Sequence, residues 1–205
     1  GELPFAHYYG SVDATPLWLM LLGEAVAWTG DGHLVDRLWP AVLRAVEWLR
    51  GAPHDEDGFL VYRTRVAGGL RNQGWKDSAD AIRDRQGRIL EPPIALAEVQ
   101  AYAIDARRRV AGLARSRGDD GLAAALEAEA TRLAGAFDAR FWQADGERYA
   151  MGIAAGGQVA DALASNVGHC LWAGAVPPRR AAAVARALVA PPLFSGWGVR
   201  TYAAG

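Results

Sequence analysis

The sequence predicts an all-α fold, an α/α toroid of which about three helix hairpins are present. Six segments show helical periodicity, and they come in pairs. The connection within each pair is only a few residues long, whereas long linkers rich in glycine and aromatic residues separate the pairs, at roughly 52–91, 143–164 and from 191 onward. Short connections make antiparallel hairpins, so all the long linkers fall on one side of the hairpins. We call that side the rim.

In a toroid the first helix of each pair lies inside and the second returns behind it. A closed barrel of the (α/α)6 type has six hairpins, so we expect residues 1–205 to form a single, partial barrel domain, with short β segments such as the alternating run 57–65 in the rim linkers. An α-solenoid also stacks helix pairs. The sequence shows no repeat from pair to pair, which favours the toroid.

Capping and breaking residues set the helix boundaries. Thr15-Pro16 is a cap and first-turn signal, and Gly51 and Gly118 follow the second and third helices. Asp119 or Asp120 caps the fourth helix. The predicted helices span about 15–30, 33–50, 92–117, 120–142, 165–174 and 178–190.

Composition excludes several function classes. Hydrophobic residues make up 51% of the chain and the net charge is −1, so the chain can bury a large core and has no bulk attraction to nucleic acid. A single cysteine, Cys170, excludes an internal disulfide and a cysteine-based metal site. No apolar run has membrane-spanning length and no signal-peptide pattern opens the chain, so we expect a cytoplasmic protein without a membrane partner. The start at Gly1 rather than methionine suggests a fragment.

Four polar segments fall on the predicted rim, at 7–16, 72–81, 164–169 and 195–201. The second is the richest, because residues 72–80 combine two carboxylates, a lysine, a tryptophan and two amides with a bending glycine. Each segment alone is explained by a helix cap or a surface ion pair. Their coincidence on one rim predicts a ligand site.

Tryptophans divide into two groups. Trp18, Trp28, Trp39 and Trp48 occupy helical positions among aliphatic residues, so we expect them in the core. In contrast, two others stand beside glycines in rim loops, where an indole face suits stacking on the C–H face of a sugar. These are Trp75 and Trp197.

The rim segments together resemble the bacterial amylo-α-1,6-glucosidases, the glycogen-debranching-like glycoside hydrolases. The matching motifs are Tyr8-Tyr9-Gly10-Ser11-Val12-Asp13-Ala14-Thr15-Pro16-Leu17, residues 72–81, Ser165-Asn166-Val167-Gly168-His169, residues 195–201, and Glu98-Val99-Gln100-Ala101-Tyr102 on the third helix. The resemblance implies an (α/α)6 catalytic domain that hydrolyses α-glucosidic bonds with inversion and needs no cofactor. An inverting pair consists of one carboxylic acid and one carboxylate roughly 6.5–9.5 Å apart.

The resemblance assigns the general acid to Asp77, with Asp80 as the alternative because Lys76 departs from the pattern of related trehalases. A helix N-terminus and Lys76 would favour the ionised carboxylate, so burial beside Trp75 has to outweigh them. No base is identified, since in this clan it comes from a later part of the barrel. Glu98 sits inside a helix among apolar residues, and we expect it to be a structural or supporting group.

A carbohydrate is thus the expected partner, and no metal constellation is found. By its place in the first rim loop Asp13 resembles a carboxylate that holds sugar hydroxyls. The full set of expected substrate-binding residues is Tyr9, Asp13, Gln73, Trp75, Lys76, Asn166, His169, Trp197 and Arg200.

Two other functions stay open. A sugar isomerase or epimerase on the same toroid works with histidine pairs, and of the four histidines only His7 and His169 are on the rim. A non-catalytic carbohydrate-binding module is the third hypothesis. The linkage, the chain length of the substrate and the oligomeric state are not specified by the sequence.

Overall fold

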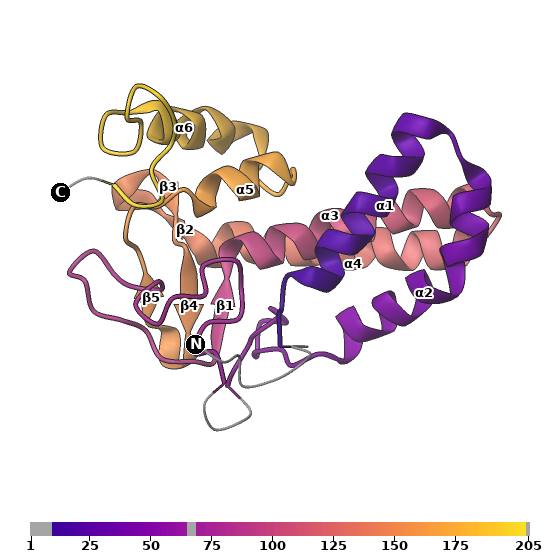
Figure 1. Cartoon of the computed structure of the whole chain (residues 1–205), viewed down its shortest axis with the longest axis horizontal. Coiled ribbons are helices and arrows are strands. Elements are labelled where there is room, and N and C mark those ends of the chain that lie inside the picture. Colours follow the sequence, from indigo (N-terminus) through magenta and orange to yellow (C-terminus); the bar gives the residue numbers. More distant parts are fainter. Residues whose placement is uncertain (1–9, 65–68, 204–205) are drawn as a thin grey trace, which may run out of the picture.

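The computed structural model describes residues 10–64 and 69–203 of the chain. Its described part contains three pairs of α-helices, as predicted, with short strands between the pairs (Figure 1). The helices are α1 (Ala14–Thr29), α2 (Gly32–Gly51), α3 (Ala97–Ser116), α4 (Asp120–Phe141), α5 (Asn166–Trp172) and α6 (Pro178–Val189). None of the helices in these described ranges is both long and apolar enough to cross a membrane.

Local signals close the turns within the pairs. Gly30 ends α1 in the left-handed region, with φ of 67°, and the side chain of Asp31 caps α2 by accepting a hydrogen bond from the Leu34 N–H. Asp119 caps α4 in the same way, from the Leu122 N–H. The predicted cap of α4 is therefore confirmed as Asp119 rather than Asp120, whereas the predicted cap at Thr15 is wrong, because α1 already begins at Ala14 with Asp13 at the cap position.

Helix α3 is the centre of the packing. The helices α1, α3 and α5 pack against one another in that order, while α4 pairs with α3 along their length (Figure 1). Alanines make up much of α3 and most of its residues are buried, because small side chains allow neighbours to approach from several sides. The first helices of the three pairs thus form one layer, as a toroid requires.

Short strands occupy the linkers between the pairs, as expected. Strands β1 (Ile94–Leu96), β4 (Gly152–Ala154) and β5 (Val159–Ala160) form an antiparallel sheet in the order β1-β4-β5. Strands β2 (Trp142–Gln143) and β3 (Arg148–Tyr149) form a separate hairpin. The sheet joins the linker before α3 to the linker before α5.

Two predicted elements are wrong. The run 57–65 is no strand over its described residues, which make only isolated bridges, because the backbone N–H and C=O of Leu60 pair with the side-chain amide of Gln100. The third helix begins at Ala97 and not at 92, since residues 94–96 pair with β4 instead. The polar segment 72–81 therefore does not lie at the start of a helix.

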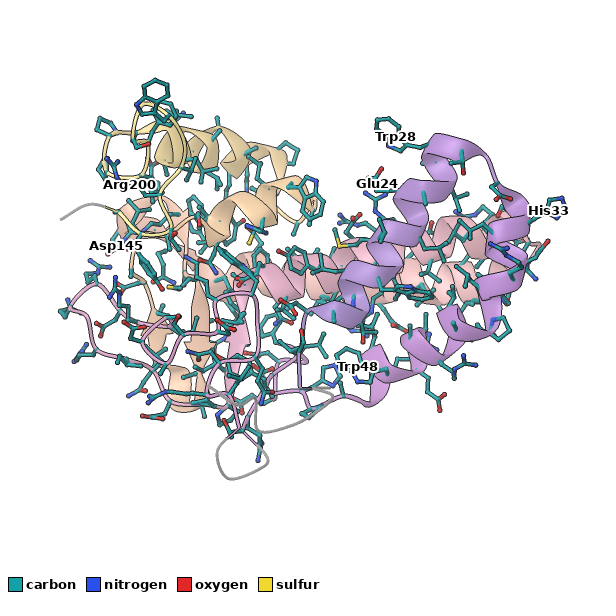
Figure 2. The ribbon with its side chains drawn as sticks, viewed as in Figure 1. Glu24, Trp28, His33, Trp48, Asp145 and Arg200 are labelled. Atoms are coloured by element: carbon teal, nitrogen blue, oxygen red, sulfur yellow. The ribbon has the colours of Figure 1, made fainter. Side chains whose placement is uncertain are left out.

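The helical tryptophans are only partly in the core. Trp18 and Trp39 pack against it, but Trp48 lies at the surface and Trp28 is 88% exposed, projecting away from the helices (Figure 2). The prediction for Trp28 is wrong because α1 is apolar on nearly every face, and the face that carries Leu21 and Trp28 has no neighbour among the described residues.

Candidate functional site

The four polar rim segments meet in space. The Val12 N–H donates to the Gln73 carbonyl at 2.9 Å, which joins the first segment to the second. The Trp75 indole stacks on the His169 ring, with centroids 5.2 Å apart and an interplanar angle of 20°, which joins the second to the third. Segments that lie far apart in the sequence thus build one surface.

The fourth segment closes the same arrangement through the Thr201 carbonyl. It accepts a hydrogen bond from the Ser165 N–H at 3.2 Å and another from Lys76 Nζ at 2.8 Å. The second and third segments therefore both donate a hydrogen bond to one backbone oxygen of the fourth.

Behind these loops, the N-termini of the three first helices converge. Asp13 occupies the cap position of α1, yet its carboxylate makes no capping bond. Glu98 lies in the first turn of α3, and Asn166 is the first residue of α5. Asn166 Nδ2 donates to Glu98 Oε1 at 2.8 Å, and both side chains are fully buried. Helix N-termini favour negative charge, which suits the carboxylates placed there.

Glu98 has an unusual environment for a carboxyl group. Burial raises its pKa from 4.5 to about 7, against the lowering effects of the Asn166 bond and of the Lys76 charge; Asp13 adds a smaller increase. Neither Glu98 Oε2 nor Asn166 Oδ1 has a hydrogen-bond partner among the residues that the structure describes. Two buried acceptors without a donor mark a polar site at the centre of the rim.

Lys76 is buried between two aromatic rings. Its Nζ lies 4.9 Å from the Trp75 centroid and 4.2 Å from the Tyr202 centroid. Burial lowers the pKa of Lys76 to about 8, opposed by the Glu98 carboxylate and assisted by Arg83. The ammonium therefore points into the protein, although Asp77 beside it in the sequence is exposed.

Trp75 is held in place by its stack on His169. The ring of His169 is itself fixed by a contact between its Nδ1 and the Tyr102 hydroxyl. Burial and the Lys76 charge lower the pKa of His169, which favours the neutral imidazole. The indole keeps 42% of its surface exposed, so it presents a fixed aromatic wall to a ligand.

A cavity of about 310 Å³ opens beside this wall. The exposed carboxylates of Asp77 and Asp80 both line it, and neither forms an ion pair with a described residue. The complete lining consists of Trp75, Lys76, Asp77, Ser78, Asp80, Ala81, Arg83, Thr201 and Tyr202. Such a cavity combines hydrogen-bonding carboxylates with an apolar wall, as sugar recognition requires.

The remaining expected site residues lie elsewhere. Gln73 donates from Nε2 to the Arg63 carbonyl, and Arg200 donates to the Pro191 carbonyl. Trp197 is 97% exposed at the tip of a tight turn closed by Ser195, away from the cavity lining. Figure 2 shows Arg200 in the same C-terminal segment. Tyr9, like His7, lies outside the described residues.

Two lining residues were missed from the sequence, Arg83 and Tyr202. Tyr202 directly follows the fourth polar segment, and this position was the sequence signal that could have identified it as a lining residue. Its hydroxyl donates to the Ala81 carbonyl, across 121 positions of the chain. Arg83 lay outside the second segment and resembled a surface arginine.

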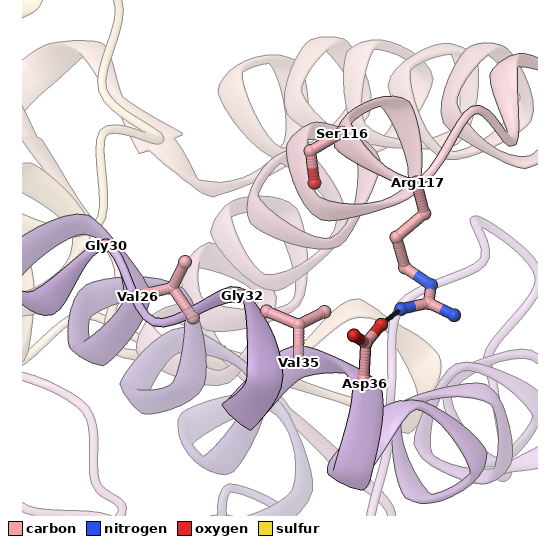
Figure 3. Close-up of a pocket in the computed structure, with 7 residues that line it drawn as sticks. All are labelled: Val26, Gly30, Gly32, Val35, Asp36, Ser116 and Arg117. Carbon is pink, nitrogen blue, oxygen red and sulfur yellow. Dashed lines mark hydrogen bonds and ion pairs between the residues drawn. The ribbon is translucent and has the colours of Figure 1, made fainter.

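A larger cavity offers less chemistry. A cavity of about 490 Å³ lies at the opposite end of α1, between its turn into α2 and the end of α3, and the Arg117–Asp36 ion pair lines it (Figure 3). The charged groups among its described lining residues are thus already paired with each other. Within residues 10–64 and 69–203, no cluster of three or more histidine, cysteine or acidic side chains is arranged to hold a metal.

Comparisons with known proteins give a fold likeness. No protein-family model and no curated protein matches the sequence. The structure resembles a GH78 family rhamnosidase of Bacillus sp. GL1, with a TM-score of 0.69 and 22% identity over 93% of this chain and 18% of that one. It also resembles a rhamnosidase from Klebsiella oxytoca with rhamnose bound, with a TM-score of 0.59 and 20% identity over 90% of this chain and 31% of that one.

The chain therefore spans less than a third of either structure that it resembles. At such identities the likeness shows a shared fold, which is consistent with the predicted partial helical toroid. The amylo-α-1,6-glucosidase family in particular is not confirmed.

Proposed function

We propose that this chain forms part of an α/α-toroid glycoside hydrolase that cleaves α-glucosidic bonds with inversion of configuration. The observation that carries the proposal is the cavity in which Asp77 and Asp80 stand beside the Trp75 wall. The fold likeness to two rhamnosidases supports the same reaction class. Asp77 serves as the general acid in this proposal, although its side chain is exposed and the burial beside Trp75 expected from the sequence is not found.

In this mechanism the protonated carboxyl of Asp77 donates its proton to the glycosidic oxygen as the bond to the anomeric carbon breaks. A second carboxylate removes a proton from a water molecule that attacks the opposite face of the sugar. We propose that this base lies outside residues 1–205. Asp80 is only three positions from Asp77 and lines the same cavity, which makes it the alternative acid rather than the base.

Other residues would hold the sugar. Trp75 stacks on its apolar face, while His169 and Tyr102 fix the indole from behind. Asp13, whose carboxylate is not used as a helix cap, accepts hydrogen bonds from sugar hydroxyls near the Glu98–Asn166 pair. Carboxylates accept such bonds strongly because they are charged.

The matched variants Asp77→Asn and Asp80→Asn in the full-length protein test the acid. We expect Asp77→Asn to lower kcat on isomaltose by about 10²–10⁴-fold and Asp80→Asn to have a much smaller effect. Proton NMR of the first product gives the configuration, and inversion requires the β-anomer. Normal hydrolysis by Asp77→Asn would remove Asp77 from this role.

The substrate sugar is tested in the same assays. A rhamnoside is the second candidate, favoured because both similar structures are rhamnosidases. Nitrophenyl α-glucoside and α-rhamnoside, compared by kcat/KM, separate the two. Interconversion of free sugars without hydrolysis would instead indicate an isomerase or epimerase, although His169 is the only described histidine beside the cavity. Sugar binding without any turnover would indicate a binding module.

A further inference from the structure

Two cations in the cavity lie against one aromatic ring. Lys76 Nζ and Arg83 Cζ are each 4.2 Å from the centroid of the Tyr202 ring. The ring is fixed, because its hydroxyl donates to the Ala81 carbonyl and its backbone bridges to Ala164. The two cations therefore both contact the Tyr202 ring.

Arg83 differs from the other arginines of its loop. Arg85 bonds to the carboxylates of Asp161 and Asp145, and Arg88 bonds to Asp84. The half-buried guanidinium of Arg83 forms no ion pair and no hydrogen bond with any residue in the described ranges. Its five N–H donors remain available on the cavity side, where it forms part of the lining.

The neighbouring charges oppose each other. Arg83 is one of the causes that lower the pKa of Lys76. Lys76 uses one of its three donors on the Thr201 carbonyl. A sugar hydroxyl could accept a hydrogen bond from these groups. A carboxylate would accept charge-assisted hydrogen bonds, which are stronger, although the carboxylates of Asp77 and Asp80 on the same lining oppose it.

We propose that the cavity selects a glycan whose sugar unit at the cleaved bond carries a carboxylate, a uronic acid, held by Arg83 and Lys76. This inference rests on the proposed glycoside hydrolase reaction and replaces glucose by a uronic acid as the sugar at the cleaved bond. A guanidinium matches a carboxylate with two parallel hydrogen bonds, whereas an ammonium acts as a point charge. The ring of the same sugar lies against Trp75, and Asp80 accepts a hydroxyl hydrogen bond.

Calorimetry with methyl α-glucoside and methyl α-glucuronide tests the inference, because the two ligands differ only at C6. We expect the glucuronide to bind about ten-fold more tightly, as one charge-assisted pair implies. The preference should weaken as salt is raised. Arg83→Gln should bring the ratio of the two affinities close to one. Arg83→Lys should retain part of the preference, since it keeps the charge and loses the second hydrogen bond.

Arg115→Gln is the control, because Arg115 lies at the far end of α3 and pairs there with Glu127. Arg115→Gln should leave the ratio of the two affinities unchanged. If the ratio fell as much as in Arg83→Gln, the preference would arise from the overall charge of the protein and not from Arg83. Equal binding of both sugars by the unmutated protein would overturn the inference and leave the proposed function standing. Failure of both sugars to bind would count against the proposed sugar site itself. Equal competition by sodium acetate would show an anion site without sugar selectivity and would also overturn the inference.

Circular dichroism and thermal unfolding confirm that each variant is folded. If Arg83→Gln does not fold, Arg83→Lys decides the question. An unchanged ratio in folded Arg83→Lys would then contradict the role of the guanidinium.

Discussion

Asn166 Nδ2 donates a hydrogen bond of 2.8 Å to Glu98 Oε1 and so ties the N-terminus of α5 to the first turn of α3. The second oxygen of Glu98 and the Asn166 Oδ1 are both buried acceptors without a donor in the described structure. We expect a proton on Glu98 Oε2 to donate to Asn166 Oδ1, which would complete a cyclic acid–amide pair. The raised pKa of Glu98, about 7, favours this protonated form.

Glu98→Gln should therefore change how stability depends on pH. Between pH 4.5 and 7 the folded carboxyl holds a proton that the unfolded carboxyl has released. Its contribution to stability is fully present below pH 4.5 and is lost as the pH rises through 7. Glutamine supplies the same donor at every pH, so Glu98→Gln should become more stable relative to the unmutated protein by an amount on the order of 3 kcal/mol across this window.

Urea unfolding at several pH values measures this difference. Glu47→Gln, at an exposed position on α2, is the control and should show no comparable trend. A stability difference for Glu98→Gln that stays constant with pH would mean that Glu98 is ionised in the folded protein.

Asn166→Ala should destabilise the protein by about 1–3 kcal/mol, because it removes the donor to Glu98 Oε1 and leaves a buried carboxyl group without its amide partner. The double variant with Glu98→Gln should lose less than the sum of the two single changes, since both remove the same pair. Strict additivity in urea unfolding would show that the two residues act independently.

Asp138 should contribute strongly to the stability of the protein. Its buried carboxylate accepts from the Tyr149 hydroxyl at 2.5 Å and pairs with Arg180 at 2.8 Å, which joins α4 to β3 and α6. Asp138→Ala should cost about 3–5 kcal/mol because it leaves a partly buried cation unpaired. Arg179→Gln is the matched control: Arg179 also contacts Asp138 but is largely exposed, so its loss should cost less than about 1 kcal/mol. Similar losses in thermal unfolding would contradict this ranking.

Trp75→Ala should weaken sugar binding about five-fold, because the loss of an aromatic stack costs roughly 1 kcal/mol. Trp28→Ala removes an equally large but exposed indole at the end of α1 and should leave binding unchanged. Calorimetry with the preferred sugar compares the two. Equal affinities for Trp75→Ala and the unmutated protein would mean that the sugar does not touch this wall.

The helix pairs could be predicted because their signals are local. Gly30, Asp31 and Asp119 fix their turns through bonds to residues at most four positions away. The start of α3 could not be predicted from local signals. Residues 94–96 form a strand instead of the first helical turn because they pair with β4, nearly sixty positions later. Likewise, Leu60 satisfies its backbone groups through Gln100 rather than a strand partner.

The candidate site was predictable in outline for a similar reason. Four polar segments at the same ends of the hairpins have to meet if the hairpins stack, and the contact between Trp75 and His169 shows two of them meeting. The direction of each side chain depends on tertiary packing instead. Lys76 turns inward between two rings, and Tyr202 brings Arg83 into the cavity lining, neither of which follows from local sequence.

The most direct test of the proposed function is the kinetics of Asp77→Asn with two leaving groups. If Asp77 donates the proton, the variant should lose about 10²–10⁴-fold in kcat on isomaltose, whose sugar leaving group needs protonation. It should lose far less on dinitrophenyl α-glucoside, whose leaving group departs without a proton. Equal losses on both substrates, or no loss on isomaltose, would contradict the assignment of Asp77 as the general acid.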